Sequence, residues 1–257
     1  MFISTSEDFS IGYKQKILHQ NLPLCIEKNK LICLLGANGS GKSTLLRTLA
    51  GLQKPLKGNV FIEQNKLQKL SNTQIAQLIS IVFTKTPTPT LKVVELMQIS
   101  LFAQTNWWGN LNAMHHHRIA NVLKNLQIQH LAEQTLYELS DGQLQKVMIA
   151  RALVQNTPII ILDEPTAHLD LLNRIQIFNL LKKTTIEEQK TILIATHDWE
   201  IAQHIADEIW FLDTKNGLKI VKNKNESLHL DYILPYVTHS LKNDEQLLLS
   251  KILKNNN

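Results

Sequence analysis

One glycine-rich stretch constrains this chain more than any other part of its sequence. Residues 36–44 read Gly-Ala-Asn-Gly-Ser-Gly-Lys-Ser-Thr and follow a buried apolar run at 31–35. Apolar residues Leu45, Leu46 and Leu49 then recur at helical spacing. A glycine-rich loop between a strand and a helix turns its backbone amides inward, at the positive end of the helix dipole. We therefore expect a loop that binds phosphate groups.

The side chains of this loop match the full pattern of a nucleotide-phosphate loop, with a glycine-lysine pair followed by hydroxyl residues. We expect Lys42 to reach the β- and γ-phosphates and Thr44 to add a further phosphate contact. Ser43 is expected to offer its hydroxyl to Mg²⁺. The other nucleotide-contacting positions expected in the loop are Gly36, Asn38, Gly39 and Gly41.

Two neighbouring carboxylates follow a second buried strand. The apolar run 159–162 ends in Asp163 and Glu164. Acids at the carboxyl end of a strand lie in the crevice where open α/β sheets bind ligands. We expect Asp163 to hold Mg²⁺, because this ion prefers hard oxygen ligands. Glu164 is expected to polarise the attacking water as a general base.

The order of elements predicts an α/β fold with a mostly parallel sheet. A third buried strand at 191–195 is separated from the second by a helical stretch around 174–183. Alternating strands and helices are typical of parallel sheets. Residues before about 27 alternate like antiparallel strands, and the runs 208–212 and 218–221 indicate a terminal strand pair.

Composition and charge exclude several classes of protein. Hydrophobic residues make up 44% and charged residues 19% of the 257 residues, as in ordinary globular proteins. No apolar run approaches the ~20 residues that span a bilayer, and the N-terminus resembles no secretory signal. We therefore expect the chain to stay in the cytoplasm. The net charge of +5 comes from scattered lysines, so we expect no nucleic-acid partner.

A further motif identifies the family. Residues 139–143 read Leu-Ser-Asp-Gly-Gln, precede a helical pattern and lie upstream of the two carboxylates. The motif resembles the signature of the ATP-binding cassette (ABC) family of P-loop NTPases, which have a RecA-like core. In that family a serine and a glycine at a helix N-terminus bind the γ-phosphate held by the opposite subunit. The resemblance covers about residues 9–221 and implies nucleotide contacts by Ser140, Gly142 and Gln143.

The resemblance implies roles for other residues in the same order along the chain. Tyr13 matches the aromatic residue that stacks on adenine, and Asp170 ends the loop that follows the catalytic strand. His197 matches the family's switch histidine and is a second catalytic candidate. The sequence departs from the family at Thr84, where a glutamine usually contacts Mg²⁺, and at Asp141, which replaces a glycine. Thr84 still offers a hydroxyl oxygen as a candidate metal ligand.

The periodicity of the sequence, which turns helical between Pro89 and Asn156, predicts the domain organisation. We expect one nucleotide-binding domain over residues 1–225, with antiparallel N-terminal strands and a helical subdomain inserted at about 88–156. A C-terminal tail over 226–257 is expected to pack on the body or on a partner. The pair Trp107 and Trp108 suits a core and an interface equally well.

The resemblance predicts a function in transport. The sequence around Ala50-Gly51-Leu52 and Thr196-His197-Asp198 looks most like ATPases of importers for iron siderophores, haem and vitamin B12. It implies a head-to-tail homodimer that takes ATP and Mg²⁺, drives a separate integral membrane permease at the cytoplasmic face of the inner membrane, and depends indirectly on an extracytoplasmic substrate-binding protein. The alternatives are a non-transport ABC ATPase, an importer ATPase for another cargo such as a metal ion, and a protein that binds ATP without hydrolysing it.

Overall fold

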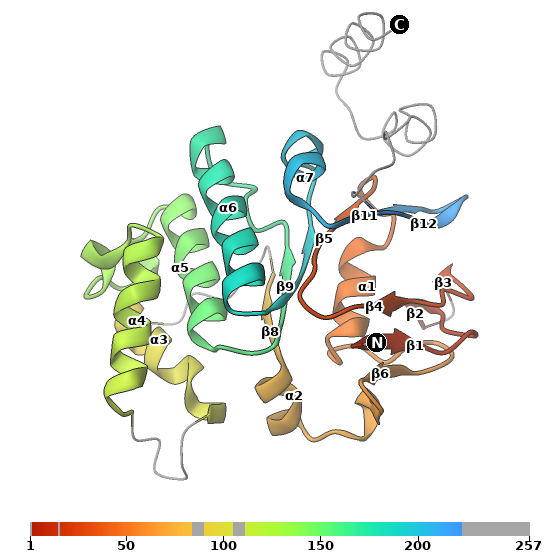
Figure 1. Cartoon of the computed structure of the whole chain (residues 1–257), viewed down its shortest axis with the longest axis horizontal. Helices are drawn as coiled ribbons and strands as arrows, with labels where there is room; N and C mark the ends of the chain where they lie inside the picture. Colours follow the sequence, from red (N-terminus) through yellow and green to blue (C-terminus); the bar gives the residue numbers. More distant parts are fainter. Residues whose placement is uncertain (1, 15, 84–89, 105–110, 223–257) are drawn as a thin grey trace, which may run out of the picture.

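A six-stranded sheet forms the centre of the fold. The computed structural model describes residues 2–222 except 15, 84–89 and 105–110. Within these residues the central sheet has the order β12-β11-β5-β10-β9-β8 (Figure 1). All neighbours pair in parallel except β11 and β12. The strands are β5 Leu31–Leu35, β8 Ile79–Val82, β9 Ile159–Asp163, β10 Thr191–Ala195, β11 Glu208–Asp213 and β12 Gly217–Lys222.

This sheet confirms the predicted fold class. The apolar runs 31–35 and 191–195 are strands over the predicted residues, and the terminal pair is antiparallel. The second strand extends one residue beyond its predicted apolar run, because Asp163 still pairs with Ala195. The carboxylate therefore belongs to the strand and not to the loop after it.

The N-terminal part forms two smaller antiparallel sheets, as the sequence indicated. One has the order β4-β1-β6-β7, and the other pairs β2 with β3. The sequence analysis did not predict β6 and β7. The strands are β1 Ile3–Thr5, β2 Ile11–Tyr13, β3 Lys16–His19, β4 Cys25–Ile26, β6 Val60–Ile62 and β7 Asn65–Lys66.

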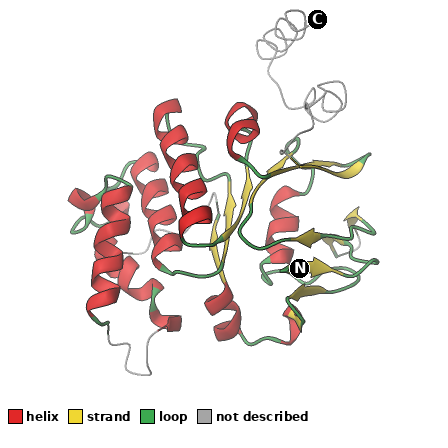
Figure 2. Cartoon of the chain, in the orientation of Figure 1, coloured by secondary structure: helices red, strands yellow, loops and turns green. Residues whose placement is uncertain are grey.

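Helices cover both faces of the central sheet (Figure 2). Helices α3, α4 and α5 gather beyond the β8 edge, in the region predicted to be helical (Figure 1). In the described ranges, no helix is both long and apolar enough to cross a bilayer. The helices are α1 Lys42–Leu49, α2 Asn72–Leu78, α3 Val93–Ser100, α4 Ala113–Asn125, α5 Asp141–Val154, α6 Leu171–Glu187 and α7 Trp199–Ile205, with short 3-10 helices η1 Leu67–Lys69, η2 Phe102–Gln104, η3 Gln129–Leu131 and η4 Leu136–Glu138.

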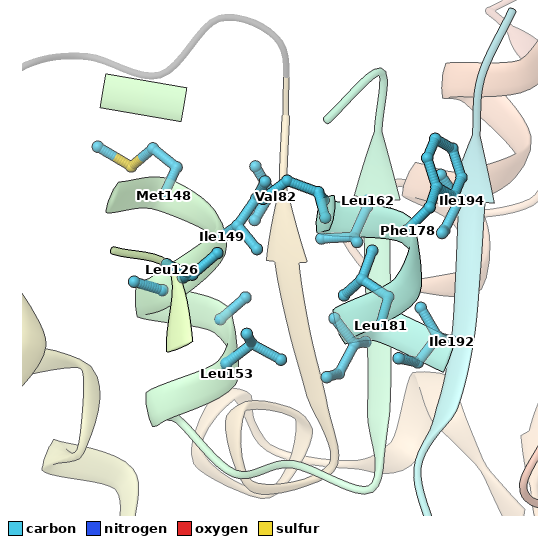
Figure 3. Packing of buried hydrophobic residues seen from close by; sticks show 14 of the residues in the cluster. Val82, Leu126, Met148, Ile149, Leu153, Leu162, Phe178, Leu181, Ile192 and Ile194 are labelled. Carbon is cyan, nitrogen blue, oxygen red and sulfur yellow. The ribbon is translucent and has the colours of Figure 1, made fainter. Parts of the chain in front are cut away.

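The core consists of two apolar clusters, one on each face of the sheet. Successive residues of a strand point to opposite faces, so Leu31 and Cys33 join one cluster while Ile32 and Leu34 join the other. The first cluster contains the buried faces of α5 and α6, and Figure 3 shows side chains of both helices beside the strands. The second cluster contains the apolar face of α1. Helices α1 and α5 therefore pack on opposite faces of the sheet.

Several predictions concern residues outside the described ranges. They are the metal role of Thr84, the environment of Trp107 and Trp108, and the packing of the tail at 226–257. The domain boundaries at 88, 156 and 225 also stay predictions.

Candidate active site

The predicted phosphate loop connects β5 to α1. At Gly36 an added Cβ would lie 2.3 Å from the carbonyl oxygen of Leu212, so the close approach of β11 requires glycine. Gly41 is the N-cap of α1 with φ +101°, a left-handed conformation that favours glycine. No side chain caps this helix end, so its first amides remain available to an anion. Asn38 and Gly39 are exposed at the crest of the loop.

Helix α1 begins at Lys42, inside the loop motif of residues 36–44, so Lys42, Ser43 and Thr44 all lie in its first turn. The Lys42 side chain is only 7% exposed, and its Nζ donates hydrogen bonds to the carbonyl oxygens of Gly36 (2.7 Å) and Ala37 (3.3 Å). Burial lowers the pKa of Lys42, and the charge of Glu164 and Asp163 opposes that shift. A buried ammonium beside an uncapped helix N-terminus fits the phosphates of a nucleotide.

Two of the three proposed magnesium ligands, Ser43 and Asp163, contact each other. Asp163 is buried at the end of β9, and Ser43 hydrogen-bonds its carboxylate. Burial raises the pKa of Asp163, the hydrogen bond from Ser43 opposes the rise, and the charge of Glu164 adds to it. A hydroxyl and a carboxylate are hard oxygen donors, and a divalent cation beside them would offset the cost of burying the charge. The residues present therefore fit Mg²⁺.

Glu164 and His197 form the next layer of the site. Glu164 follows β9 directly, and its side chain is 19% exposed. Its Oε1 lies 2.9 Å from His197 Nε2 and 3.9 Å from Lys42 Nζ. His197 comes two residues after β10. Because β10 pairs in parallel with β9, His197 and Glu164 lie at the carboxyl ends of neighbouring strands. This arrangement can hold a water beside a carboxylate and a cation.

Tyr13 lies at the side of the site nearest the antiparallel strands. Its ring is 50% exposed, and its hydroxyl is hydrogen-bonded to Thr44 Oγ1 at 3.0 Å. Tyr13 also lines a cavity of about 610 Å³, to which Arg47 and Phe83 contribute with the Arg47 guanidinium 4.9 Å from the Phe83 ring centroid. The adenine contact of Tyr13 stays a prediction. The sequence analysis did not find Arg47, because nothing in the motif marks the second turn of α1.

The signature motif lies away from this cluster. Ser140 is exposed at the N-cap of α5, where it accepts a hydrogen bond from the Gln143 amide (3.3 Å), and the Gln143 side chain accepts one from the Ser140 amide (3.0 Å). An added Cβ at Gly142 would lie 3.2 Å from the His168 carbonyl oxygen. Asp170 caps α6 through the Asn173 amide (2.9 Å). Helices α5 and α1 pack on opposite faces of the sheet, so the signature and the phosphate loop belong to helices on opposite faces.

The structure thus brings together Lys42, Ser43, Asp163, Glu164 and His197 and leaves the signature residues apart from them. Sequence reasoning missed Gln145, a buried α5 residue whose Nε2 lies 3.4 Å from the Glu164 carbonyl oxygen.

Comparison with known proteins identifies the class. Residues 19–167 match the ABC transporter family. The match covers more than half of the chain and includes the phosphate loop, the signature and both carboxylates. This chain belongs to the ABC transporter family and is an ATP-binding ATPase of that family.

Individual relatives show the extent of the similarity. The chain is 33% identical over 206 residues to the achromobactin transport ATP-binding protein CbrD of Dickeya dadantii, covering 80% of this chain and 77% of that protein. It is 34% identical over 195 residues to the iron(3+)-hydroxamate import ATP-binding protein FhuC of Bacillus subtilis, covering 76% and 72%. A dimeric ATP-binding cassette in a post-hydrolysis state bound to ADP and Pi superposes with a TM-score of 0.78 at 28% identity, covering 87% of this chain and 100% of that one.

Proposed function

We propose that this chain is the ATP-hydrolysing subunit of an importer and works as a head-to-tail homodimer that drives a separate membrane permease. The observation that carries the proposal is the division of the site. A cation, two carboxylates and a histidine lie together at one sheet edge, and an exposed serine at a helix N-terminus lies elsewhere. A second copy, turned head to tail, supplies that serine. The dimeric cassette that resembles this chain supports the arrangement.

In the proposed mechanism each residue has a separate task. Lys42 and the amides at the start of α1 bind the β- and γ-phosphates, and Tyr13 stacks on adenine. Mg²⁺, held by Ser43 and Asp163, would neutralise charge on the phosphates. Ser140 and Gly142 of the second copy bind the γ-phosphate from the opposite side, with Gln143 and Asp170 beside them. These contacts close the dimer only when ATP is present.

Glu164 and His197 carry the chemical step. Glu164 accepts a proton from the attacking water, because its carboxylate lies beside the phosphate-binding Lys42 and is not one of the proposed Mg²⁺ ligands. His197 holds the carboxylate in place from 2.9 Å, and its partly exposed ring would contact the γ-phosphate. After hydrolysis, charge repulsion between ADP and phosphate favours opening of the dimer.

We propose iron complexes, such as siderophores or haem, or cobalamin as the cargo. The names of the two relatives, one for achromobactin transport and one for iron(3+)-hydroxamate import, support iron complexes. The permease would hold the chain at the cytoplasmic face of the cell membrane, and an extracytoplasmic binding protein would deliver the cargo. The alternatives are an importer for a free metal ion and a non-transport cassette ATPase.

A glutamate substitution tests the mechanism. Glu164→Gln removes the base and keeps the shape, so hydrolysis is expected to fall at least ~100-fold. ATP binding is expected to persist, and the variant should accumulate as an ATP-bound dimer in size-exclusion chromatography. The exposed Glu133→Gln is the matched control and should hydrolyse ATP like the wild type. Hydrolysis by Glu164→Gln at the wild-type rate contradicts the mechanism.

The transport role requires a separate test. The tagged chain should copurify with an integral membrane permease, and proteoliposomes of the two with the binding protein should take up a ferric siderophore when ATP is supplied. Uptake of a free divalent metal ion in place of the siderophore would assign the alternative cargo. Copurification with ribosomes and no membrane protein would contradict the transport role.

A further inference from the structure

A buried glutamine connects the signature helix to the proposed catalytic base. Gln145 lies on the second turn of α5, five residues after Ser140, and is only 6% exposed. Its Nε2 donates a hydrogen bond to the backbone carbonyl of Glu164 at 3.4 Å. A buried amide that loses its partner carries a desolvation cost, so this contact constrains both elements.

The backbone of Glu164 has an unusual conformation. Its φ is +52°, in the left-handed region that residues with a Cβ seldom adopt. The amide before its Cα donates to the Ala195 carbonyl at 2.9 Å. The carbonyl after its Cα accepts from Gln145 and, also at 3.4 Å, from the Ala167 amide. Such a conformation persists only where the surroundings hold it.

These contacts fix the Cα–Cβ direction of Glu164, from which its side chain extends. With the peptide on each side of Cα held, the carboxylate points to His197 Nε2 at 2.9 Å. Both contacts to the carbonyl are long, so each alone is weak and the loss of either leaves the carbonyl weakly held. A small rotation of that peptide would swing the carboxylate away from a water beside the phosphate, and a misplacement of ~1 Å can cost about 100-fold in rate.

We propose that Gln145 is a positioning residue that aims the Glu164 carboxylate and transmits the position of the signature helix to it. The inference rests on the proposed role of Glu164 as the base. Helix α5 presents Ser140 at its start and also packs there on the loop after Glu164, since Gly142 lies against His168. In the proposed dimer, Ser140 binds the γ-phosphate held by the opposite subunit, whereas Gln145 of the same helix contacts Glu164 of its own chain. Docking of α5 at one site therefore changes the position of the base at the other site.

The test replaces the amide and keeps the volume. Gln145→Leu should lower kcat for ATP about 10-fold and leave the affinity for ATP within about 2-fold, because no nucleotide contact is lost. The matched control is Gln155→Leu at the C-cap of the same helix, which removes an amide that donates to the Ala76 carbonyl at 2.8 Å, far from the site. The control should keep both kcat and affinity. An equal kcat for the two variants overturns the proposal.

A double substitution separates aiming from general damage. Once Glu164→Gln has removed the base, Gln145→Leu should slow single-turnover hydrolysis by less than about 2-fold, since both changes act through one group. If the rate loss of the double variant equals the product of the two single losses, the proposal is overturned. If Gln145→Leu does not fold, Gln145→Asn, which shortens the amide, is expected to show the same loss of kcat and the same non-additivity.

This design distinguishes a failure of the proposed function from a failure of the positioning role. Wild-type hydrolysis by Glu164→Gln overturns the proposed function itself. Slow hydrolysis by Glu164→Gln together with normal hydrolysis by Gln145→Leu overturns only the positioning role.

Discussion

Arg118 ties the helices beyond the β8 edge to the rest of the fold, and its removal is expected to lower stability markedly. From α4, its guanidinium donates to the carbonyl oxygens of Leu153 (2.7 and 3.2 Å) and Val154 (3.2 Å) in the last turn of α5. It also pairs with Glu188, one residue past α6, at 2.9 Å. One side chain therefore connects α4 to the C-terminal ends of both α5 and α6.

The two kinds of contact contribute unequal amounts. The Arg118 side chain is 24% exposed and that of Glu188 is 42% exposed, so the ion pair alone contributes about 0.5 kcal/mol. The carbonyl groups at the helix end would lose a charged donor, which costs about 1–3 kcal/mol, and the favourable interaction with the helix dipole adds ~0.5 kcal/mol. Arg118→Ala should therefore lower the free energy of unfolding by about 2–4 kcal/mol, against ~0.5 kcal/mol for Glu188→Gln.

Urea titration with calorimetry measures both variants. For a chain of this size, Arg118→Ala should lower Tm by roughly 4–16 °C and Glu188→Gln by about 2 °C or less. Arg118→Lys keeps the charge and loses the planar fork, so an intermediate value is expected. If Arg118→Ala costs no more than Glu188→Gln, the carbonyl contacts contribute nothing and the reasoning is wrong.

Other expected outcomes concern the nucleotide site and the thiols. Lys42→Ala should weaken ATP binding at least ~10-fold in isothermal titration, because it removes a charge-assisted phosphate contact. Tyr13→Phe should keep ATP affinity within about 3-fold while Tyr13→Ala loses about 10-fold, since stacking needs the ring and not the hydroxyl; equal losses would contradict stacking. Burial raises the pKa of Cys33 to about 12, so at pH 8 the native protein should expose one reactive thiol, Cys25, and the unfolded protein two.

The core strands could be predicted because each is a short apolar run between polar segments. Residues 31–35 and 191–195 are buried on both faces of the sheet, so nearly every position in them is apolar and the strands stand out in the sequence. The segment from β6 to α2 gave no comparable signal. Strands β6 and β7 have three and two residues, and α2 has no fully buried residue, so neither period nor hydrophobicity marks them.

The same contrast holds for the candidate site. Loop and carboxylate positions follow from local motifs, since a phosphate loop needs its glycines and lysine close together in sequence. The left-handed backbone of Glu164 and its contact with Gln145 could not be predicted, because they depend on how α5 packs against the loop after β9. The Tyr13–Thr44 hydrogen bond joins residues 31 positions apart for the same reason.

The composite site is the central claim, and a mixing experiment tests it most directly. Ser140→Arg blocks the signature of one chain, and Lys42→Ala disables the phosphate loop of the other, so each variant alone should be inactive. In a head-to-tail heterodimer the intact loop of the first chain meets the intact signature of the second. An equimolar mixture should therefore recover up to about a quarter of wild-type hydrolysis, because about half of the dimers carry one intact site of two. No recovery at any mixing ratio, with heterodimers demonstrated to form, would contradict the account.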